Sequence, residues 1–313
     1  MPKYSLRPFP GALDVELDSR CGLRCPMCVR GQPGFTRPNQ GPMSWTILGR
    51  IAREIRNRRD TEYPVRWIWA HLGGESLLNP DAPAMIAELV KAGSGGRQPF
   101  TIALSTAAYM KMSDWMISEL LSSGLHRLHL SVDGVTKETY EKIRVGAKFE
   151  RTMENVRRIL AMAANRVQSG MPCPTIFLQI LRLEENAGEI EEFVHKYSTN
   201  QGDVRKYQPL KGGVPGRVFA KAVERFGGQV AGVESSPGWD RANKRRLTCT
   251  KPFQRCSIFS DGGIGICCYD IGATLRLGTL ENNSINGVWR ATPYKRLREN
   301  WLRGQYPKLC EDC

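Results

Sequence analysis

The first two thirds of the chain alternate short apolar segments with amphipathic helical patterns. Strand-like segments occupy six ranges, 12–17, 65–71, 101–106, 126–132, 175–181 and 204–210. Between them, apolar residues recur at helical spacing, with Ser44 and Ser113 as N-caps and a third helix from about Glu150. Such alternation predicts an α/β fold with a parallel sheet, open or closed into a barrel, and a site at the carboxyl ends of its strands.

A cysteine triplet follows the first of these segments. Cys21, Cys25 and Cys28 have the spacing Cys-x3-Cys-x2-Cys. Three thiolates this close can ligate three corners of a cubic iron–sulfur cluster and leave the fourth iron open to a substrate or cofactor. A structural zinc site is the alternative, but it usually needs a fourth Cys or His nearby, and the next one along the chain is His71. The spacing therefore favours an iron–sulfur cluster.

The triplet and the segment LGGESLLNP at 72–80, directly after a strand, resemble the radical S-adenosylmethionine (SAM) enzymes. The resemblance implies that the open iron chelates SAM and that the Gly-Gly-Glu motif holds its amino group. It also implies that a serine on the fourth strand faces SAM and that a helix arginine pairs with its carboxylate, although a solvated arginine would fit the same pattern. The implied SAM-binding residues are Gly73, Gly74, Glu75, Ser131 and Arg144.

One segment departs from that family pattern. Many relatives carry Thr-Asn-Gly after the third strand, whereas this chain has LSTAA at 104–108. Ser105 and Thr106 are still expected to line the site. Asp133, before Gly134, fits a turn residue equally well.

The tail carries six cysteines, Cys249, Cys256, Cys267, Cys268, Cys310 and Cys313. Together with a hairpin pattern at 257–268, they resemble a shortened SPASM module, often called Twitch, which binds one auxiliary 4Fe-4S cluster. A cluster held wholly by protein needs four thiolates, and we expect them from Cys256, Cys267, Cys310 and Cys313. The fourth ligand is open, because Cys256 occupies what is usually an apolar strand position in the family. Family spacing would make Cys249 the fourth ligand instead, and a zinc ribbon is the other interpretation of the tail.

These features predict three regions. Residues 1–210 form a partial (β/α)6 radical SAM barrel, the Gly-, Pro- and Ser-rich residues 211–248 form a linker or lid, and residues 249–313 form a small α+β auxiliary-cluster module. The expected cofactors are two 4Fe-4S clusters and SAM.

The resemblance further implies that the enzyme removes a hydrogen atom from an unactivated C–H bond. It extends to small Twitch enzymes of aminoglycoside biosynthesis, and the expected activity is epimerisation, with the protonated Cys249 thiol returning hydrogen. An aminocyclitol dehydrogenase that uses the auxiliary cluster as electron acceptor is one alternative. A nucleic-acid-binding protein with structural zinc is another, of a different class.

The net charge of +14 comes from basic residues that are scattered along the chain. We therefore expect no nucleic-acid partner, and no apolar run suggests a signal peptide or a membrane partner, which favours the cytoplasm. The expected partners are an aminoglycoside substrate and an electron donor such as a flavodoxin or ferredoxin. A polycationic substrate needs acidic residues near strand ends, and the candidates are Asp14, Glu16, Asp18, Glu184 and Glu185. The four histidines are expected to pack or to lie at the surface.

Overall fold

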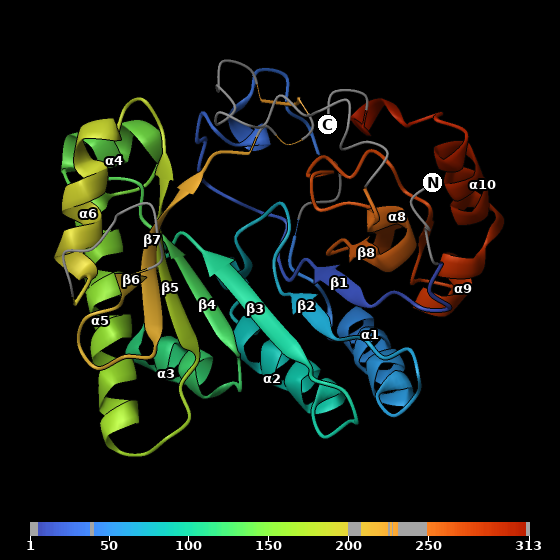
Figure 1. Cartoon of the computed structure of the whole chain (residues 1–313), viewed down its shortest axis with the longest axis horizontal. Coiled ribbons are helices and arrows are strands. Elements are labelled where there is room, and N and C mark those ends of the chain that lie inside the picture. The colour runs from blue at the N-terminus through green and yellow to red at the C-terminus, as the bar shows by residue number, and fades with distance from the viewer. Residues whose placement is uncertain are drawn as a thin grey trace.

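One curved sheet runs through the whole molecule (Figure 1). The computed structural model describes residues 6–37, 41–199, 208–224, 226, 228–230 and 249–310. Its sheet has ten strands in the order β10-β9-β8-β1-β2-β3-β4-β5-β7-β6. Within these ranges, no helix has both the length and the apolar character that a membrane crossing requires.

Six parallel strands form the central part of this sheet. They are β1 (Ala12–Val15), β2 (Trp67–Trp69), β3 (Thr101–Thr106), β4 (Arg127–Ser131), β5 (Thr175–Arg182) and β7 (Gly216–Ala222). Each pairs in parallel with its neighbour. The expected α/β class with a radical SAM-like partial barrel is confirmed.

Helices cover the outer face of these strands (Figure 1). They are α1 (Trp45–Arg58), α2 (Ala82–Gly93), α3 (Asp114–Ser122), α4 (Lys137–Ile143), α5 (Phe149–Gln168) and α6 (Ile190–Tyr197). Both expected N-caps are confirmed, because Ser44 Oγ accepts from Ile47 N at 3.3 Å and Ser113 Oγ accepts from Met116 N at 3.1 Å. The described residues also form short 3-10 turns at Val29–Gly31 (η1), Ser76–Leu78 (η2), Ala187–Glu189 (η3) and Lys308–Cys310 (η5).

The sixth parallel strand lies later in the chain than the sequence indicates. The range 204–210 contributes only β6 (Gln208–Pro209), which is antiparallel, and residues 204–207 lie outside the described residues. The strand that pairs with β5 is β7, inside the range expected to be a linker. The prediction took Gly216 for a residue of a Gly-rich linker. In the structure it lies against β5, where a Cβ on this residue would lie 2.2 Å from Ile176 O. This glycine permits close strand pairing and is not part of a turn.

The tail extends the same sheet on its other edge. It contains α8 (Lys251–Gln254), β8 (Arg255–Ile258), β9 (Gly263–Gly265), β10 (Gly278–Thr279), α9 (Ile285–Arg290) and α10 (Thr292–Leu302). The expected hairpin is confirmed as β8 and β9, with Gly262 in the left-handed region at φ +84°. The sequence did not indicate that β8 pairs in parallel with β1.

Strand alternation separates an apolar outer face from a polar inner face. Leu13, Ile68, Ile102, Leu128 and Ile176 are wholly buried toward the helices. In each strand, the residues directly before and after these point to the opposite face of the sheet. Consequently the inner face carries polar and aromatic side chains, and these line the site described next.

Candidate active site

A cavity of about 630 Å³ opens at the carboxyl ends of the parallel strands. It is lined by all eight residues expected on its SAM-binding side, which are Cys21, Cys25, Cys28, Gly73, Gly74, Glu75, Ser131 and Arg144. Residues of the tail, including Arg255, Cys268 and Tyr269, complete the wall. Barrel and module therefore share one cavity.

The cysteine loop is a tight turn held by its own backbone. Cys28 N donates to Cys25 O at 3.0 Å, and Tyr109 Oη accepts the Gly22 N–H at 2.8 Å. A Cβ on Gly31 would lie 2.1 Å from Cys25 O, so glycine is required there. Burial raises the pKa of Cys25 to about 11. The thiolate that a cluster needs would therefore be stabilised mainly by the metal itself.

The donor set of this loop fits an iron–sulfur cube. Three thiol-bearing residues line one cavity and face space that a ligand can enter. In the described ranges, no three His, Cys, Asp or Glu side chains converge as ligands of a single ion would. A cube takes each thiolate on a different iron, so its ligands stand apart from one another.

Glu75 of the Gly-Gly-Glu motif is fixed by the segment that departs from the family pattern. Its carboxylate accepts from Thr106 Oγ1 at 2.9 Å, Ala107 N at 3.0 Å and Leu77 N at 3.2 Å. Burial raises the pKa of Glu75. The expectation that Ser105 and Thr106 line the site is confirmed, and Thr106 also orients the motif's carboxylate.

The two glycines of this motif serve close packing between parts of the chain. A Cβ on Gly74 would lie 2.0 Å from Asp18 O, and one on Gly73 would lie 2.7 Å from Ile271 Cγ2. Either side chain would push the motif away from β1 or from the module.

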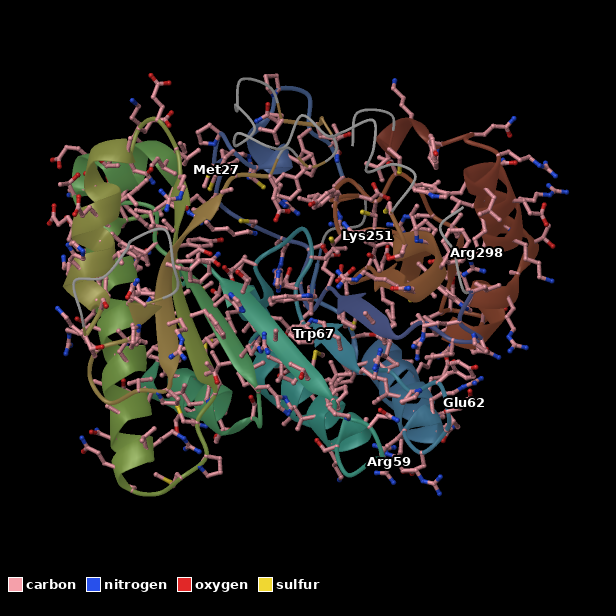
Figure 2. All side chains as sticks on the ribbon, viewed as in Figure 1. Met27, Arg59, Glu62, Trp67, Lys251 and Arg298 are labelled. Carbon is pink, nitrogen blue, oxygen red and sulfur yellow. The ribbon has the colours of Figure 1, made fainter. Side chains whose placement is uncertain are left out.

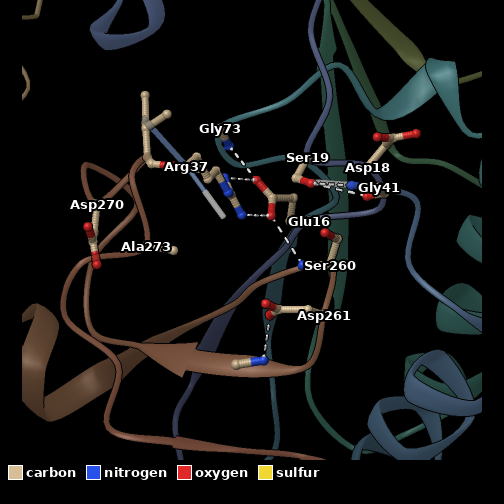
Figure 3. Close-up of polar contacts among 12 residues, drawn as sticks. Glu16, Asp18, Ser19, Arg37, Gly41, Gly73, Ser260, Asp261, Asp270 and Ala273 are labelled. Carbon is tan, nitrogen blue, oxygen red and sulfur yellow. Dashed lines mark hydrogen bonds and ion pairs between the residues drawn. The ribbon is translucent and has the colours of Figure 1, made fainter. Parts of the chain in front are cut away.

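A buried ion pair joins the same motif to the module (Figure 3). Glu16 accepts two hydrogen bonds from Arg37, one of them at 2.7 Å, and also accepts from Gly73 N and Ser260 N, each at 3.1 Å. Arg37 Nη1 in turn donates to Ile271 O at 2.8 Å. This pair therefore ties β1 and the Gly-Gly-Glu loop to two loops of the tail.

Asp133 orients Arg144 and is a functional residue that sequence reasoning left open. Its Oδ2 lies 2.6 Å from Arg144 Nε and 2.5 Å from Nη2, and its Oδ1 accepts from Leu181 N. Coulombic attraction from Asp133 opposes the effect of burial, and the pKa of Arg144 is raised. Ser131 Oγ accepts from Gln179 Nε2 at 2.8 Å, so this pair is also fixed.

The wall nearest the module carries paired charges. Asp14 accepts from Arg255 at 3.0 Å and from Ser257 Oγ at 3.0 Å, and burial raises its pKa to about 7. Glu224 pairs with Lys221 at 2.9 Å. All five carboxylates expected near strand ends are among the described residues, and of these only Asp14 lines the cavity. Glu16 and Asp18 instead pair with arginines. Glu184 and Glu185 are exposed.

The tail cysteines gather around Lys251, labelled in Figure 2. Lys251 Nζ lies 3.5 Å from Cys267 Sγ and 3.6 Å from Cys268 Sγ. A hydrogen bond from the Cys268 thiol lowers the pKa of Cys267. Cys249 also interacts electrostatically with Lys251, and Cys310 interacts with Cys267.

Cys256 and Cys313 stand apart from this group. Cys256 is wholly buried on β8 and points away from the inner face that carries Arg255 and Ser257. Cys313 lies outside the described residues. Its role, like that of Cys256, stays a prediction.

Three inner-face residues are a second set that sequence reasoning did not assign. Trp69, His71 and His129 line the cavity, whereas the histidines were expected to pack or lie at the surface. The period-two series Trp67, Trp69, His71 was the available signal.

Comparisons with known proteins agree with this geometry. The model of the radical SAM superfamily matches residues 15–197, and that of the SPASM iron–sulfur cluster-binding domain matches residues 249–313. A SAM-binding 4Fe-4S cluster and an auxiliary iron–sulfur cluster follow from these two matches, and SAM is bound in neighbouring structures.

Similar curated proteins include GTP 3',8-cyclases. That of Peptoclostridium acidaminophilum is 22% identical over 78% of this chain and 68% of its own length. That of Aliarcobacter butzleri is 26% identical over 46% of this chain and 41% of its own length. The chain spans about half the length of most curated relatives it matches.

Solved structures with this fold include BtrN in complex with AdoMet and 2-DOIA. It has a TM-score of 0.60 at 14% identity, and the match covers 99% of this chain and 94% of that one. Streptococcus suis SuiB bound to the precursor peptide SuiA has a TM-score of 0.64 at 13% identity, over 99% and 72%. At such identities the likeness concerns the fold alone.

Proposed function

Because the chain belongs to the radical SAM superfamily, we propose that it is an epimerase that inverts a C–H stereocentre of an aminoglycoside, of the type that converts neomycin C to neomycin B. One observation carries the proposal. The module completes the wall of the cavity that the expected SAM-binding residues line, and it brings more cysteines than one cubic cluster can use. A thiol beside a radical site can return a hydrogen atom.

Residues of the barrel would hold and orient SAM. Gly73, Gly74 and Glu75 would hold the amino group, and Arg144, which Asp133 orients through Nε and Nη2, would pair with the carboxylate. Ser131 borders the same space. When bound, the cluster and SAM supply a carbon-centred radical that removes a hydrogen atom from a substrate C–H bond. The surrounding protein excludes water and fixes the carbon that reacts.

The proposed return step uses the Cys249 thiol. Its S–H bond breaks, a C–H bond forms on the opposite face of the substrate carbon, and sulfur keeps the unpaired electron. One electron and one proton then restore the thiol, and the electron comes from a donor such as a flavodoxin or ferredoxin. The step requires a protonated, unligated cysteine.

Two tail thiols compete for this role. Cys268 lines the cavity, but its hydrogen is engaged by the Cys267 sulfur. Cys249 is half-buried beside Lys251 and forms no hydrogen bond with a described residue. This difference supports Cys249 over Cys268 as the donor, although Cys268 lines the cavity and Cys249 does not. We keep Cys256, Cys267, Cys310 and Cys313 as the proposed auxiliary-cluster ligands, although Cys256 points away from the cysteines around Lys251.

An aminocyclitol dehydrogenase is the second candidate, because the iron–sulfur module contributes residues to the cavity wall. In that reaction the auxiliary cluster would take an electron from the substrate radical. A GTP cyclase is the activity of several sequence relatives, but the cationic side chains that line the described part of the cavity all have partners within the protein. Membership of the radical SAM superfamily leaves the zinc-containing nucleic-acid-binding alternative without support.

A product assay in deuterated water separates these functions. Anaerobic holoprotein is incubated with SAM, a reductant and neomycin C. An epimerase forms 5'-deoxyadenosine and an epimer that carries one solvent deuterium at the inverted carbon, because thiol hydrogens exchange with solvent. A ketone product without solvent deuterium would replace the proposal with the dehydrogenase.

Cysteine variants test the donor, with Cys249→Ala and Cys268→Ala as a matched pair. We expect Cys249→Ala to keep about eight irons per chain, following from two four-iron cubes, to cleave SAM and to release no epimer. Cys268→Ala should still epimerise. If Cys249→Ala lost iron, and Cys268→Ala kept its iron but released no epimer, Cys249 would be a cluster ligand and Cys268 the hydrogen donor.

A further inference from the structure

The wall of the cavity opposite the cysteine loop is aromatic. Trp69 and His71 follow one another on the inner face at and just beyond β2, and His129 lies on β4. The Trp69 ring lies 5.2 Å from that of His71 and 5.3 Å from that of His129, measured between centroids. His129 also stacks on Phe177 at 4.6 Å with an interplanar angle of 9°. Each ring is therefore held by its neighbours, and the ring of Trp67, labelled in Figure 2, lies 5.5 Å from that of Trp69.

The two imidazoles present polar atoms to this space. His71 Nδ1 accepts the Ser105 N–H at 3.1 Å, so the hydrogen of the neutral ring is on Nε2. His129 Nε2 is buried and forms no hydrogen bond of ordinary geometry with a described residue. The Gln179 side chain lies close enough to raise the pKa of His129 against the effect of burial, but its amide donates to Ser131 Oγ at 2.8 Å. A buried polar atom without a partner is costly. A ligand that hydrogen-bonds to His129 would remove that cost.

Both rings are neutral over the physiological range. Burial is the largest cause in each case, and it lowers the pKa of His71 to about 3 and that of His129 to about 4. A neutral imidazole offers one donor and one acceptor. Hydroxyl groups, which both donate and accept, are its natural complement.

Charged side chains of the cavity are already engaged. Each has a partner within the protein, in the pairs Asp14–Arg255, Glu224–Lys221 and Arg144–Asp133, and the Arg30 guanidinium donates to two backbone carbonyls. Among the described residues of the cavity wall, a phosphate chain would have to break such contacts to reach a cation. A ring with several hydroxyl groups would not.

We infer that Trp69, His71 and His129 form the substrate subsite of this enzyme and that it binds a polyhydroxylated ring of the carbohydrate or aminocyclitol class. The apolar C–H face of the ring packs against the Trp69 indole. Its hydroxyl groups bond to His71 Nε2–H and to His129 Nε2. An ammonium substituent on the same ring gains a cation–π contact with the indole. The inference rests on the proposed function, for which it names the residues that read the substrate.

Equilibrium binding without turnover tests this subsite. Neomycin C is titrated into anaerobic holoprotein saturated with S-adenosylhomocysteine, by calorimetry. His129→Phe keeps a flat ring for Phe177 to stack on and removes the Nε2 atom. We expect its affinity for neomycin C to fall about three- to ten-fold, as loss of one neutral hydrogen bond predicts, with unchanged iron content and S-adenosylhomocysteine affinity.

His126→Phe is the matched control. His126 packs edge-on against Phe100 at 6.0 Å and does not line the cavity. We expect it to bind neomycin C as the wild type does. Wild-type affinity in a correctly folded His129→Phe protein would overturn the subsite.

The two proposals fail separately. If the wild type binds neomycin C and forms no epimer from it, while His129→Phe still weakens binding, the proposed function fails and the subsite stands. If epimer forms and His129→Phe leaves the affinity for neomycin C unchanged, the proposed function stands and the subsite fails.

Discussion

Replacing Glu16 with glutamine tests the joint between barrel and module. The Glu16 and Arg37 side chains are 0% and 1% exposed, and the carboxylate accepts four hydrogen bonds. Glutamine has one acceptor oxygen where glutamate has two, so about half of these bonds are lost and Arg37 no longer faces a carboxylate charge at this position. Removing one partner of a buried ion pair costs about 3–5 kcal/mol. Two lost hydrogen bonds to charged groups, at about 1.5–3 kcal/mol each, give a similar figure.

Urea unfolding of the anaerobic holoprotein, followed by tryptophan fluorescence, measures this cost. We expect Glu16→Gln to lower the free energy of unfolding by about 4 kcal/mol. Adding Arg37→Met should restore part of this free energy, because the double variant no longer buries the guanidinium that the Glu16 carboxylate compensates. SAM affinity should also fall, since Gly73 N loses the acceptor that fixes the Gly-Gly-Glu loop.

A surface pair provides the control. Glu88 lies 2.7 Å from Arg56, with side chains 33% and 44% exposed. Glu88→Gln should therefore cost less than about 1 kcal/mol. If Glu16→Gln cost no more than this control, the argument that the buried pair holds barrel and module together would be refuted.

Three further predictions concern the cysteine loop, SAM and pH. Arg144→Ala should weaken SAM binding about 10- to 150-fold by calorimetry, the equivalent of about 1.5–3 kcal/mol for one charged contact; unchanged affinity would remove it from the site. Gly31→Ala should reduce iron loading, because its Cβ would lie 2.1 Å from a loop carbonyl, whereas Gly49→Ala, on an open helix face, should load normally. The pKa of His71 is lowered to about 3 in the folded protein, so between pH 3 and pH 6.5 only the unfolded chain binds a proton at this residue. The free energy of unfolding should therefore fall by about 1.4 kcal/mol for each pH unit below 6.5 because of His71. With unfolding measured at pH 7, 6 and 5, the free energy of unfolding of His71→Leu should depend less on pH than that of the wild type. The same pH dependence in both proteins would contradict the prediction.

Local patterns were sufficient for most of the barrel and for the SAM-binding side. The first five strands and the caps at Ser44 and Ser113 follow from apolar periodicity and capping chemistry, which act over a few residues. The cysteine triplet and the Gly-Gly-Glu motif are contiguous as well. Such features survive in the sequence because the residues that need each other are neighbours in it.

Features that depend on distant contacts could not be read in this way. Gly216 resembles a turn glycine, and only the Ile176 carbonyl opposite explains it. The Glu16 carboxylate meets Ser260 N across 244 residues. His129 is a site residue because its strand position faces the lumen, and no motif marks it. In each case the physical reason lies in a partner that sequence spacing does not specify.

The pairing of β8 with β1 explains why barrel and module act as one unit. Leu13 of β1 pairs with Ile68 of β2 on one side and with Cys256 of β8 on the other. This register places Arg255 and Ser257 beside Asp14 on the inner face, where both bond its carboxylate. Without the module, β1 would become an open sheet edge, Asp14 would lose two partners and the cavity would lose the wall that carries Cys268. The barrel therefore needs the auxiliary module to complete its substrate cavity as well as to hold a second cluster.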